Sequence, residues 1–237
     1  VCVACVPERP VACDEKPGKI SDMFKALFKN DQAMTVVVSI ILVYTSLNIC
    51  GNLVLYFFRF DVGNEGAYSI FAAVAFAAQV LVMMVIPLLR KRFSKSRLFI
   101  SGFIIQIAGF AVILIMAFAK LYTPQSWYIL CLPGILIYLG YGMLNVIMTI
   151  FLSDSVDYGE VMNGTREESV IFSMQTFTVK LASGVAVFLA GLVVDWIHLD
   201  TAAAVQTQDT LNALRMWMTI PSVILLIVGI FAVSYTH

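Results

Sequence analysis

The chain has 237 residues, of which 60% are hydrophobic and only 13% are charged, against roughly 25% charged residues in an ordinary soluble domain. The 15 basic and 15 acidic residues cancel to zero net charge, so nothing points to a nucleic-acid partner. The charges gather in short segments between long apolar runs. This distribution excludes an ordinary soluble domain and is typical of an all-α polytopic membrane protein.

The first 32 residues divide into two parts. Residues 1–6, VCVACV, lack the basic region and cleavage site of a signal peptide. We interpret them as the end of a preceding transmembrane helix, and the chain as a fragment. Cys2 and Cys5 have C-x-x-C spacing, but without a second pair or a nearby histidine ordinary helix-end cysteines are favoured over a metal site. Residues 7–32 form a predicted cytoplasmic linker, in which 21–30 fits either an amphipathic helix at the membrane surface or a plain linker helix.

Residues 33–237 contain six apolar segments long enough to cross the hydrocarbon core as helices, which takes about 20 residues each. Six such helices in a soluble protein would need a large polar exterior, and these residues do not supply one. We therefore predict a six-helix transmembrane bundle. The predicted spans are about 33–58, 67–89, 98–119, 127–152, 170–196 and 214–235.

Lysine and arginine are distributed unequally between the two sides of these spans. Eleven lie in the linker, in the loop 90–97 and at Arg166, whereas Arg59, Lys120 and Arg215 lie on the opposite side. Cytoplasmic loops carry the excess of basic residues in membrane proteins. Both ends of the chain are therefore predicted to be cytoplasmic.

The first span carries a polar stripe. Asn48 and Asn52 lie one helical turn apart, and Tyr44 and Tyr56 continue the same face. Amides in the hydrocarbon need hydrogen-bond partners, so the stripe is expected to face protein or a cavity. Hydrogen bonding between helices is the default, and contact with a bound solute such as a sugar is the alternative. Asn145 in the fourth span presents the same choice.

The fourth span ends in an acidic motif, SDSVDYGE. Asp154 and Asp157 are three residues apart and share one helix face, while Arg97 and Arg166 approach the same side from neighbouring loops. Such a cluster could hold the helices together at the cytoplasmic side and open when they separate. Carboxylates at exposed helix ends are more often merely solvated, and single ion pairs there contribute under about 1 kcal/mol, so both interpretations stay open.

The fifth span contains an ionisable residue, Lys180, within the apolar stretch FSMQTFTVKLASGVAVFLAGLVV. A capping box, TREE, precedes the span, which places Lys180 about 15 Å beyond the membrane entry at 1.5 Å per residue. A lysine at this depth costs about 2.5–3.5 kcal/mol, so it should face a wet cavity or a carboxylate. Gln175, Thr176 and Val179 lie on the same face. A solute pathway is favoured over a structural ion pair.

No catalytic motif occurs in the chain. The two histidines, His198 and His237, lie near predicted membrane boundaries, and no G-x-S-x-G, H-E-x-x-H or P-loop pattern is present. We therefore predict that the protein is not an enzyme.

Four motifs, ALFKNDQ, YFFRFDVGN, SDSVDYGE and SMQTFTVK, span the chain from the linker to the fifth helix. They resemble the glycoside–pentoside–hexuronide:cation symporters of the major facilitator group, melibiose carriers above all. The resemblance implies helices seven to twelve, the second six-helix bundle of a major facilitator fold, in the inner (plasma) membrane. It also implies a small sugar as solute, an N-terminal half as partner, and no cofactor beyond a coupling cation, Na⁺ or H⁺, which that half would mainly bind.

The same resemblance implies roles for individual residues. The lysine that matches Lys180 lies near the sugar and cation sites in this family, and positions that match Gln175, Thr176 and Val179 line the same cavity. Melibiose carriers have a sugar-packing tryptophan where this chain has Asn145, so the identity of the sugar stays open.

A second group of matching positions forms a cytoplasmic charge network that holds the outward-open state in this family. In this chain these positions are Arg97, Asp154, Asp157 and Arg166. The alternatives to a sugar symporter are a carrier of another solute on the same fold and a non-transporting six-helix scaffold.

Overall fold

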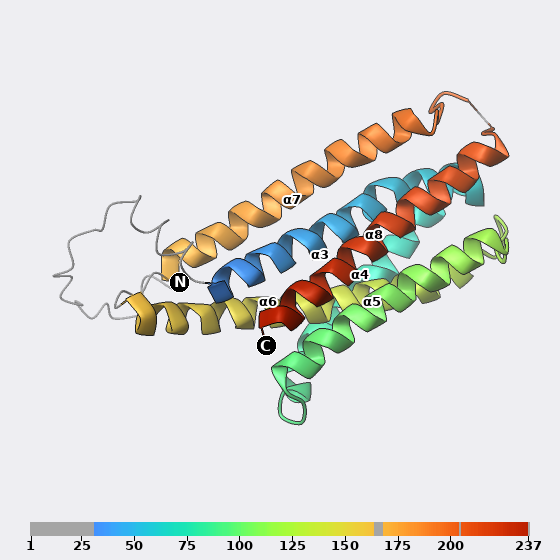
Figure 1. Cartoon of the computed structure of the whole chain (residues 1–237). Helices are drawn as coiled ribbons and strands as arrows, with labels where there is room; N and C mark the ends of the chain where they lie inside the picture. The colour runs from blue at the N-terminus through green and yellow to red at the C-terminus, as the bar shows by residue number, and fades with distance from the viewer. Residues whose placement is uncertain (1–30, 164–167, 204, 237) are drawn as a thin grey trace, which may run out of the picture.

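The computed structural model describes residues 31–163, 168–203 and 205–236, which form long helices that run side by side (Figure 1). Within these ranges six helical spans are long and apolar enough to cross a membrane, and no strand is present. The predicted all-α, six-span bundle is therefore confirmed. The helices are α3 (Asp31–Tyr56, continued by a π-helical segment, Phe57–Val62), α4 (Ala67–Leu89), α5 (Lys95–Phe118), α6 (Cys131–Asn163, preceded by a 3-10 turn, Trp127–Leu130), α7 (Glu168–Trp196) and α8 (Gln208–Thr236).

Local signals set where the helices begin and end. Helix α5 starts at Lys95, before the predicted position, because the Ser94 side chain caps it by accepting a hydrogen bond from the Arg97 backbone N–H at 3.4 Å. Helix α3 continues beyond its predicted end until Gly63, whose φ of 76° is a left-handed conformation that glycine adopts without a steric penalty. The predicted segment 1–6 and residues 7–30 of the predicted linker 7–32 lie outside the described residues, and the last two residues of that linker, Asp31 and Gln32, belong to α3.

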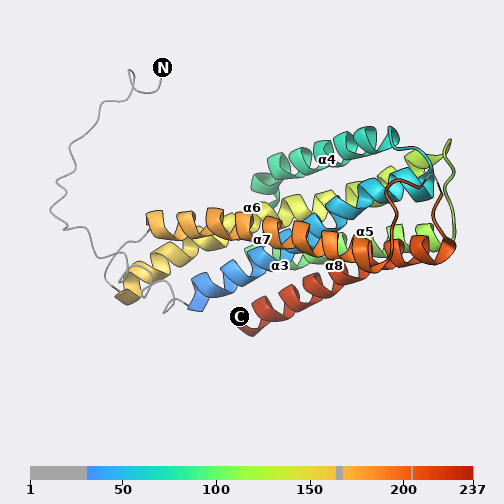
Figure 2. The same cartoon turned by 90° about the horizontal axis from the view of Figure 1, so that it is seen from above.

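The helices pack in a fixed order around α3 and α6. Helix α6 packs along α4 and α5, while α3 packs along α7 and α8, and contacts of α5 with α8 and of α3 with α6 close the bundle. Helices α4 and α7 lie at the outside and pack mainly on one neighbour each (Figures 1 and 2). Much of the surface of α7 is therefore exposed, including the apolar side chains of Phe177, Leu181 and Phe188.

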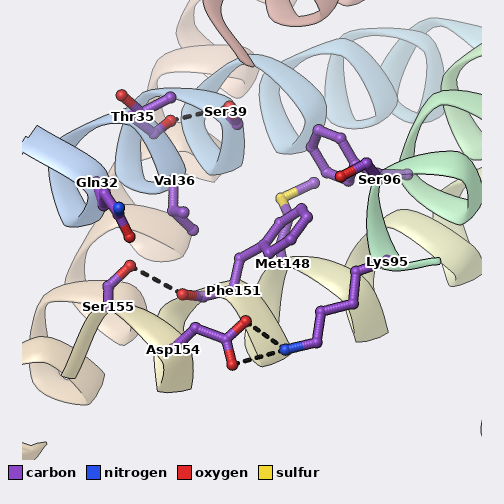
Figure 3. Close-up of a pocket in the computed structure, with 11 residues that line it drawn as sticks. Gln32, Thr35, Val36, Ser39, Lys95, Ser96, Met148, Phe151, Asp154 and Ser155 are labelled. Carbon is purple, nitrogen blue, oxygen red and sulfur yellow. Dashed lines mark hydrogen bonds and ion pairs between the residues drawn. The ribbon is translucent and has the colours of Figure 1, made fainter. Parts of the chain in front are cut away.

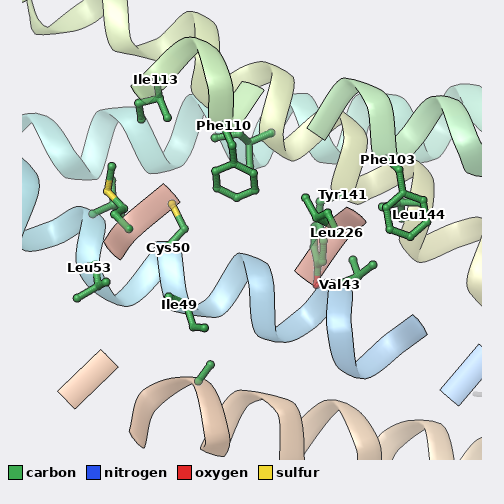
Figure 4. Close-up of a cluster of buried hydrophobic side chains, with 14 of the residues drawn as sticks. Val43, Ile49, Cys50, Leu53, Phe103, Phe110, Ile113, Tyr141, Leu144 and Leu226 are labelled. Carbon is green, nitrogen blue, oxygen red and sulfur yellow. The ribbon is translucent and has the colours of Figure 1, made fainter. Parts of the chain in front are cut away.

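Buried apolar side chains from four helices fill the centre of the bundle. Figure 4 shows Leu53 of α3, Phe103 and Phe110 of α5, Leu144 of α6 and Leu226 of α8 pointing into one cluster. All five are fully buried. In a bilayer this close packing holds the helices together, since lipid offers no hydrophobic driving force for their association.

Helices α5 and α6 approach each other closely at Gly140. A Cβ atom on this residue would lie 2.6 Å from the backbone nitrogen of Gln106 and 2.6 Å from the backbone oxygen of Gly102. Small residues at such positions let two transmembrane backbones come into contact. This contact fixes α6, the helix that carries Asn145 and Asp154, against α5.

Candidate functional site

Four polar side chains connect α3, α6 and α7 near the middle of the bundle. The Asn145 amide donates a hydrogen bond to the Tyr44 hydroxyl, and the Gln175 amide donates to the Thr149 hydroxyl at 3.3 Å. Thr149 itself donates to the Asn145 backbone oxygen at 3.0 Å. These residues, all half-buried, are called the polar band: Tyr44, Asn145, Thr149 and Gln175.

The polar band joins two of the predicted site residues, Asn145 and Gln175, through Thr149. Sequence reasoning noted Tyr44 only as part of a stripe and did not select Thr149. The position of Thr149 one turn after Asn145 was the available signal, since residues four apart share a helix face. Tyr44 is also held by its ring, which meets Tyr141 edge-on with centroids 5.4 Å apart.

Asn48 and Asn52 use their amide donors within α3. Asn48 Nδ2 donates to the Tyr44 backbone oxygen and Asn52 Nδ2 donates to the Asn48 backbone oxygen, each at 2.7 Å. Both side chains are half-buried. Neither side-chain oxygen accepts a hydrogen bond from the part of the chain that the structure describes. The expected default of helix-to-helix bonding is therefore seen at Asn145, whereas Asn48 and Asn52 bond along their own helix.

Lys180 lies on the exposed surface of α7 and has no hydrogen bond or ion pair with any described residue. Thr176, one turn away, is also exposed, and its hydroxyl donates to the Phe172 backbone oxygen at 3.1 Å. Val179 is partly buried against the core. Lys180 lies about 24 Å along the helix from the α7 end at Trp196, at 1.5 Å per residue. The ammonium group is thus deep within the span and makes no hydrogen bond with the polar band.

A pocket of about 270 Å³ lies between the ends of α3, α5 and α6, on the side of the basic loop 90–97 (Figure 3). This side of the bundle is called the basic end. The Lys95 ammonium group contacts both Asp154 carboxylate oxygens at 2.8 and 2.6 Å across the pocket. The two side chains are 36% and 44% exposed, so the pair contributes under about 1 kcal/mol.

Of the predicted charge cluster, Asp154 makes an ion pair among the described residues. Its partner is Lys95, which lies in the first turn of α5 and which sequence reasoning did not choose. Arg97 is exposed, and its guanidinium group meets no acceptor among the described residues. Asp157 lies exposed on α6, one turn beyond Asp154. Arg166 lies outside the described residues, and the role of the four as a gate stays a prediction.

The opposite end of the bundle contains a buried ion pair that sequence reasoning missed. Arg215 of α8 bonds both Asp61 carboxylate oxygens, at 2.6 and 2.8 Å, and the two side chains are 2% and 4% exposed. The Tyr122 hydroxyl donates to the same carboxylate at 2.5 Å, and Arg215 also donates to Asn212 at 3.0 Å. Burial, and then the Asp61 carboxylate, raises the pKa of Tyr122.

The sequence contained a signal for this pair. Asp61 follows the end of the first predicted span, and Arg215 lies at the start of the sixth. Both positions are on the same side of the membrane, where opposite charges can meet. Sequence reasoning used Arg215 only as one of three basic residues on the side opposite the basic loop, and the helices extend far enough to bury it. The pair joins the π-helical end of α3 to α8.

Six membrane-spanning helices, a polar band between three of them and a lysine deep within one span are features of polytopic transport proteins. The chain belongs to the MFS/sugar transport protein family, whose sequence model matches residues 4–236. The family is one of transporters, which confirms both the predicted resemblance and the prediction that the protein is not an enzyme.

Three curated relatives show how much of a complete transporter the chain covers. The uncharacterized symporter YjmB of Bacillus subtilis is 24% identical over 100% of this chain and 50% of its own length. The raffinose carrier protein of Pediococcus pentosaceus is 24% identical over 90% of this chain and 33% of its own length. The isoprimeverose transporter of Lactiplantibacillus pentosus is 26% identical over 85% of this chain and 41% of its own length. The chain thus spans half or less of the length of these relatives.

Proposed function

We propose that the chain is the second half of a symporter that couples the uptake of a sugar or glycoside to the entry of Na⁺ or H⁺. In this proposal a preceding six-helix half binds most of the coupling cation, and the two halves rock around a central site in alternating access. The family membership and the relatives named for raffinose and isoprimeverose support a sugar as the solute.

The observation that carries the proposal is the exposure of Lys180 at mid-span. A lysine ammonium group at this depth costs about 2.5–3.5 kcal/mol, and the described part of the chain offers it no counter-charge. Its partner in this proposal therefore comes from outside the described residues: water, a solute, or a carboxylate of the other half. We place Lys180, with Gln175, Thr176 and Val179, on the wall of the central site. Asn48, Asn52 and Asn145 would contribute the α3 and α6 parts of that wall.

We further propose that the basic end faces the cytoplasm of the cell and acts as a gate. The excess of lysine and arginine on this side supports the orientation. Lys95, Arg97, Asp154, Asp157 and Arg166 would supply the closing contacts. Each pair would be individually weak, as the exposed Lys95–Asp154 pair is. A gate made of several weak contacts can open without a large barrier.

Uptake by the complete transporter in membrane vesicles tests the proposal. Radiolabelled raffinose, lactose and isoprimeverose would each be offered under an imposed Na⁺ or H⁺ gradient. Lys180→Ala should reduce gradient-driven accumulation about tenfold to a hundredfold, the effect of losing a charge-assisted hydrogen bond of roughly 1.5–3 kcal/mol. Lys120→Ala is the matched control, because Lys120 is exposed at the end of the bundle opposite the basic loop 90–97, and its ammonium group bonds only the Gln208 side chain, at 3.3 Å.

Two results would overturn different parts of the proposal. Accumulation by Lys180→Ala equal to that of the unaltered transporter would remove Lys180 from the central site. Failure of the unaltered transporter to accumulate any of the three sugars under either gradient would contradict sugar symport, and would favour a carrier of another solute.

A further inference from the structure

The hydrogen bonds of Thr149 determine which end of the Gln175 side-chain amide, the NH₂ group or the oxygen, faces Thr149. A threonine hydroxyl has one proton, and Thr149 donates it to the Asn145 backbone oxygen at 3.0 Å. The hydroxyl oxygen can therefore only accept on the side of Gln175. Gln175 must turn its NH₂ group toward Thr149, at 3.3 Å, which leaves its side-chain oxygen pointing elsewhere.

The side-chain oxygen of Gln175 accepts no hydrogen bond within the described residues. The side-chain oxygens of Asn48 and Asn52 also accept no hydrogen bond within the described residues. Each of these amides uses its NH₂ group to donate to a backbone oxygen, which can only accept. Three amide oxygens on α3 and α7 thus remain available as acceptors. Half-buried acceptors without partners lose hydrogen-bond energy, so they favour a solute that carries donors. Sugar hydroxyl groups are such donors.

We propose that Thr149 is a positioning residue, which holds the Gln175 side-chain oxygen toward the solute as an acceptor for one hydroxyl group. The inference rests on the proposed function, since it assumes that the solute binds beside α3, α6 and α7. Thr149 does not contact the solute in this account. It acts through Gln175. Because Thr149 is itself hydrogen-bonded to the Asn145 backbone oxygen, it holds the Gln175 side-chain oxygen at a fixed position relative to Asn145.

The test compares three variants of the complete transporter with the sugar that the unaltered protein takes up fastest among raffinose, lactose and isoprimeverose. Thr149→Val removes the hydroxyl at nearly constant shape and should raise KM about fivefold with Vmax unchanged, as expected for losing one oriented hydrogen bond of about 1 kcal/mol. Thr149→Ser keeps the hydroxyl and should restore KM. Thr219→Val is the matched control, because that buried hydroxyl bonds only backbone oxygens of α8.

A double-mutant cycle separates positioning from a structural role. If Thr149 acts through Gln175, then Thr149→Val should not raise KM further when Gln175→Leu is already present. Independent, multiplying effects of the two substitutions would overturn the inference, as would an unchanged KM in Thr149→Val. Since KM does not depend on the amount of protein in the membrane, a folding defect would lower Vmax alone.

Where Thr149→Val abolishes uptake altogether, the same comparison is made on purified protein in detergent, by the protection that the sugar gives against thermal unfolding. Loss of protection in Thr149→Val with recovery in Thr149→Ser supports the inference, and equal protection in both overturns it. Failure of the proposed function looks different, because the unaltered transporter would then accumulate none of the three sugars.

Discussion

The buried Asp61–Arg215 pair predicts a large loss of stability when one partner is removed. In Asp61→Ala the Arg215 side chain, which is 2% exposed in the structure, would lose its bidentate acceptor, and breaking a buried pair in this way costs about 3–5 kcal/mol. The Tyr122 hydroxyl would lose its acceptor at the same time, which places the expected loss toward the upper end of this range. Proteins are stable by only about 5–15 kcal/mol, so the effect should be plain.

Unfolding of the purified protein in detergent, followed by intrinsic tryptophan fluorescence, measures this loss. Glu65→Ala is the matched control, because it removes an acid that pairs with Arg59 at 3.7 Å while both side chains are about half exposed, at 44% and 59%. Exposed pairs contribute under about 1 kcal/mol. The double variant Asp61→Leu with Arg215→Met removes both charges and should recover much of the stability, since a buried pair is often replaceable by apolar side chains.

The reasoning would be refuted by either of two results. Asp61→Ala and Glu65→Ala could lower the free energy of unfolding equally, which would mean that burial does not determine how much an ion pair contributes to stability. Alternatively, the double variant could be less stable than Asp61→Ala, which would mean that packing around the two side chains, and not the uncompensated charge, determines the loss.

Two further predictions concern Tyr122 and Gly140. Because burial and the Asp61 carboxylate raise the pKa of Tyr122, the folded state keeps a proton that the unfolded chain loses above about pH 10. The free energy of unfolding should therefore fall as the pH rises through this range, and Tyr122→Phe should make the fall shallower in denaturant titrations at several pH values; an unchanged slope would contradict the assignment. Gly140→Ala should lower the free energy of unfolding by about 1–3 kcal/mol through backbone overlap with α5, whereas Gly191→Ala, which meets nothing within 4 Å, should not; equal effects would contradict the close approach.

The spans could be predicted from the sequence because a single physical requirement dominates them. About 20 uncharged residues must cover the hydrocarbon, and segments such as 98–119 contain no charge at all. Helix ends depend on weaker local effects. The Ser94 cap and the left-handed turn at Gly63 shifted the ends of α5 and α3 by a few residues, and those shifts decided whether Asp61 and Lys95 lie on a helix.

The candidate site was predictable only as far as counting along one helix allows. The mid-span depth expected for Lys180 follows from its distance to the span boundary, and the expectation of a wet cavity or a carboxylate beside it follows from the cost of burying a charge; the latter stays a prediction. The contact between Tyr44 and Asn145 joins residues 101 apart in the sequence, and the Asp61–Arg215 pair joins residues 154 apart. Such contacts depend on how each helix is rotated toward its neighbours, and the close approach at Gly140 shows that packing sets this rotation.

The two ends of the bundle are built differently, and under the proposed function the difference suits a half-transporter that moves as one body. At one end a buried, bidentate ion pair and a tyrosine hydroxyl tie α3 to α8. At the basic end the Lys95–Asp154 pair is half exposed and lies beside a pocket. Contacts inside a rocking bundle should not change during transport, whereas contacts at a gate must break in every cycle. The proposed cycle therefore requires the strong pair to be internal and the weak pair to lie at the proposed gate, and the buried Asp61–Arg215 pair and the half-exposed Lys95–Asp154 pair fit that requirement.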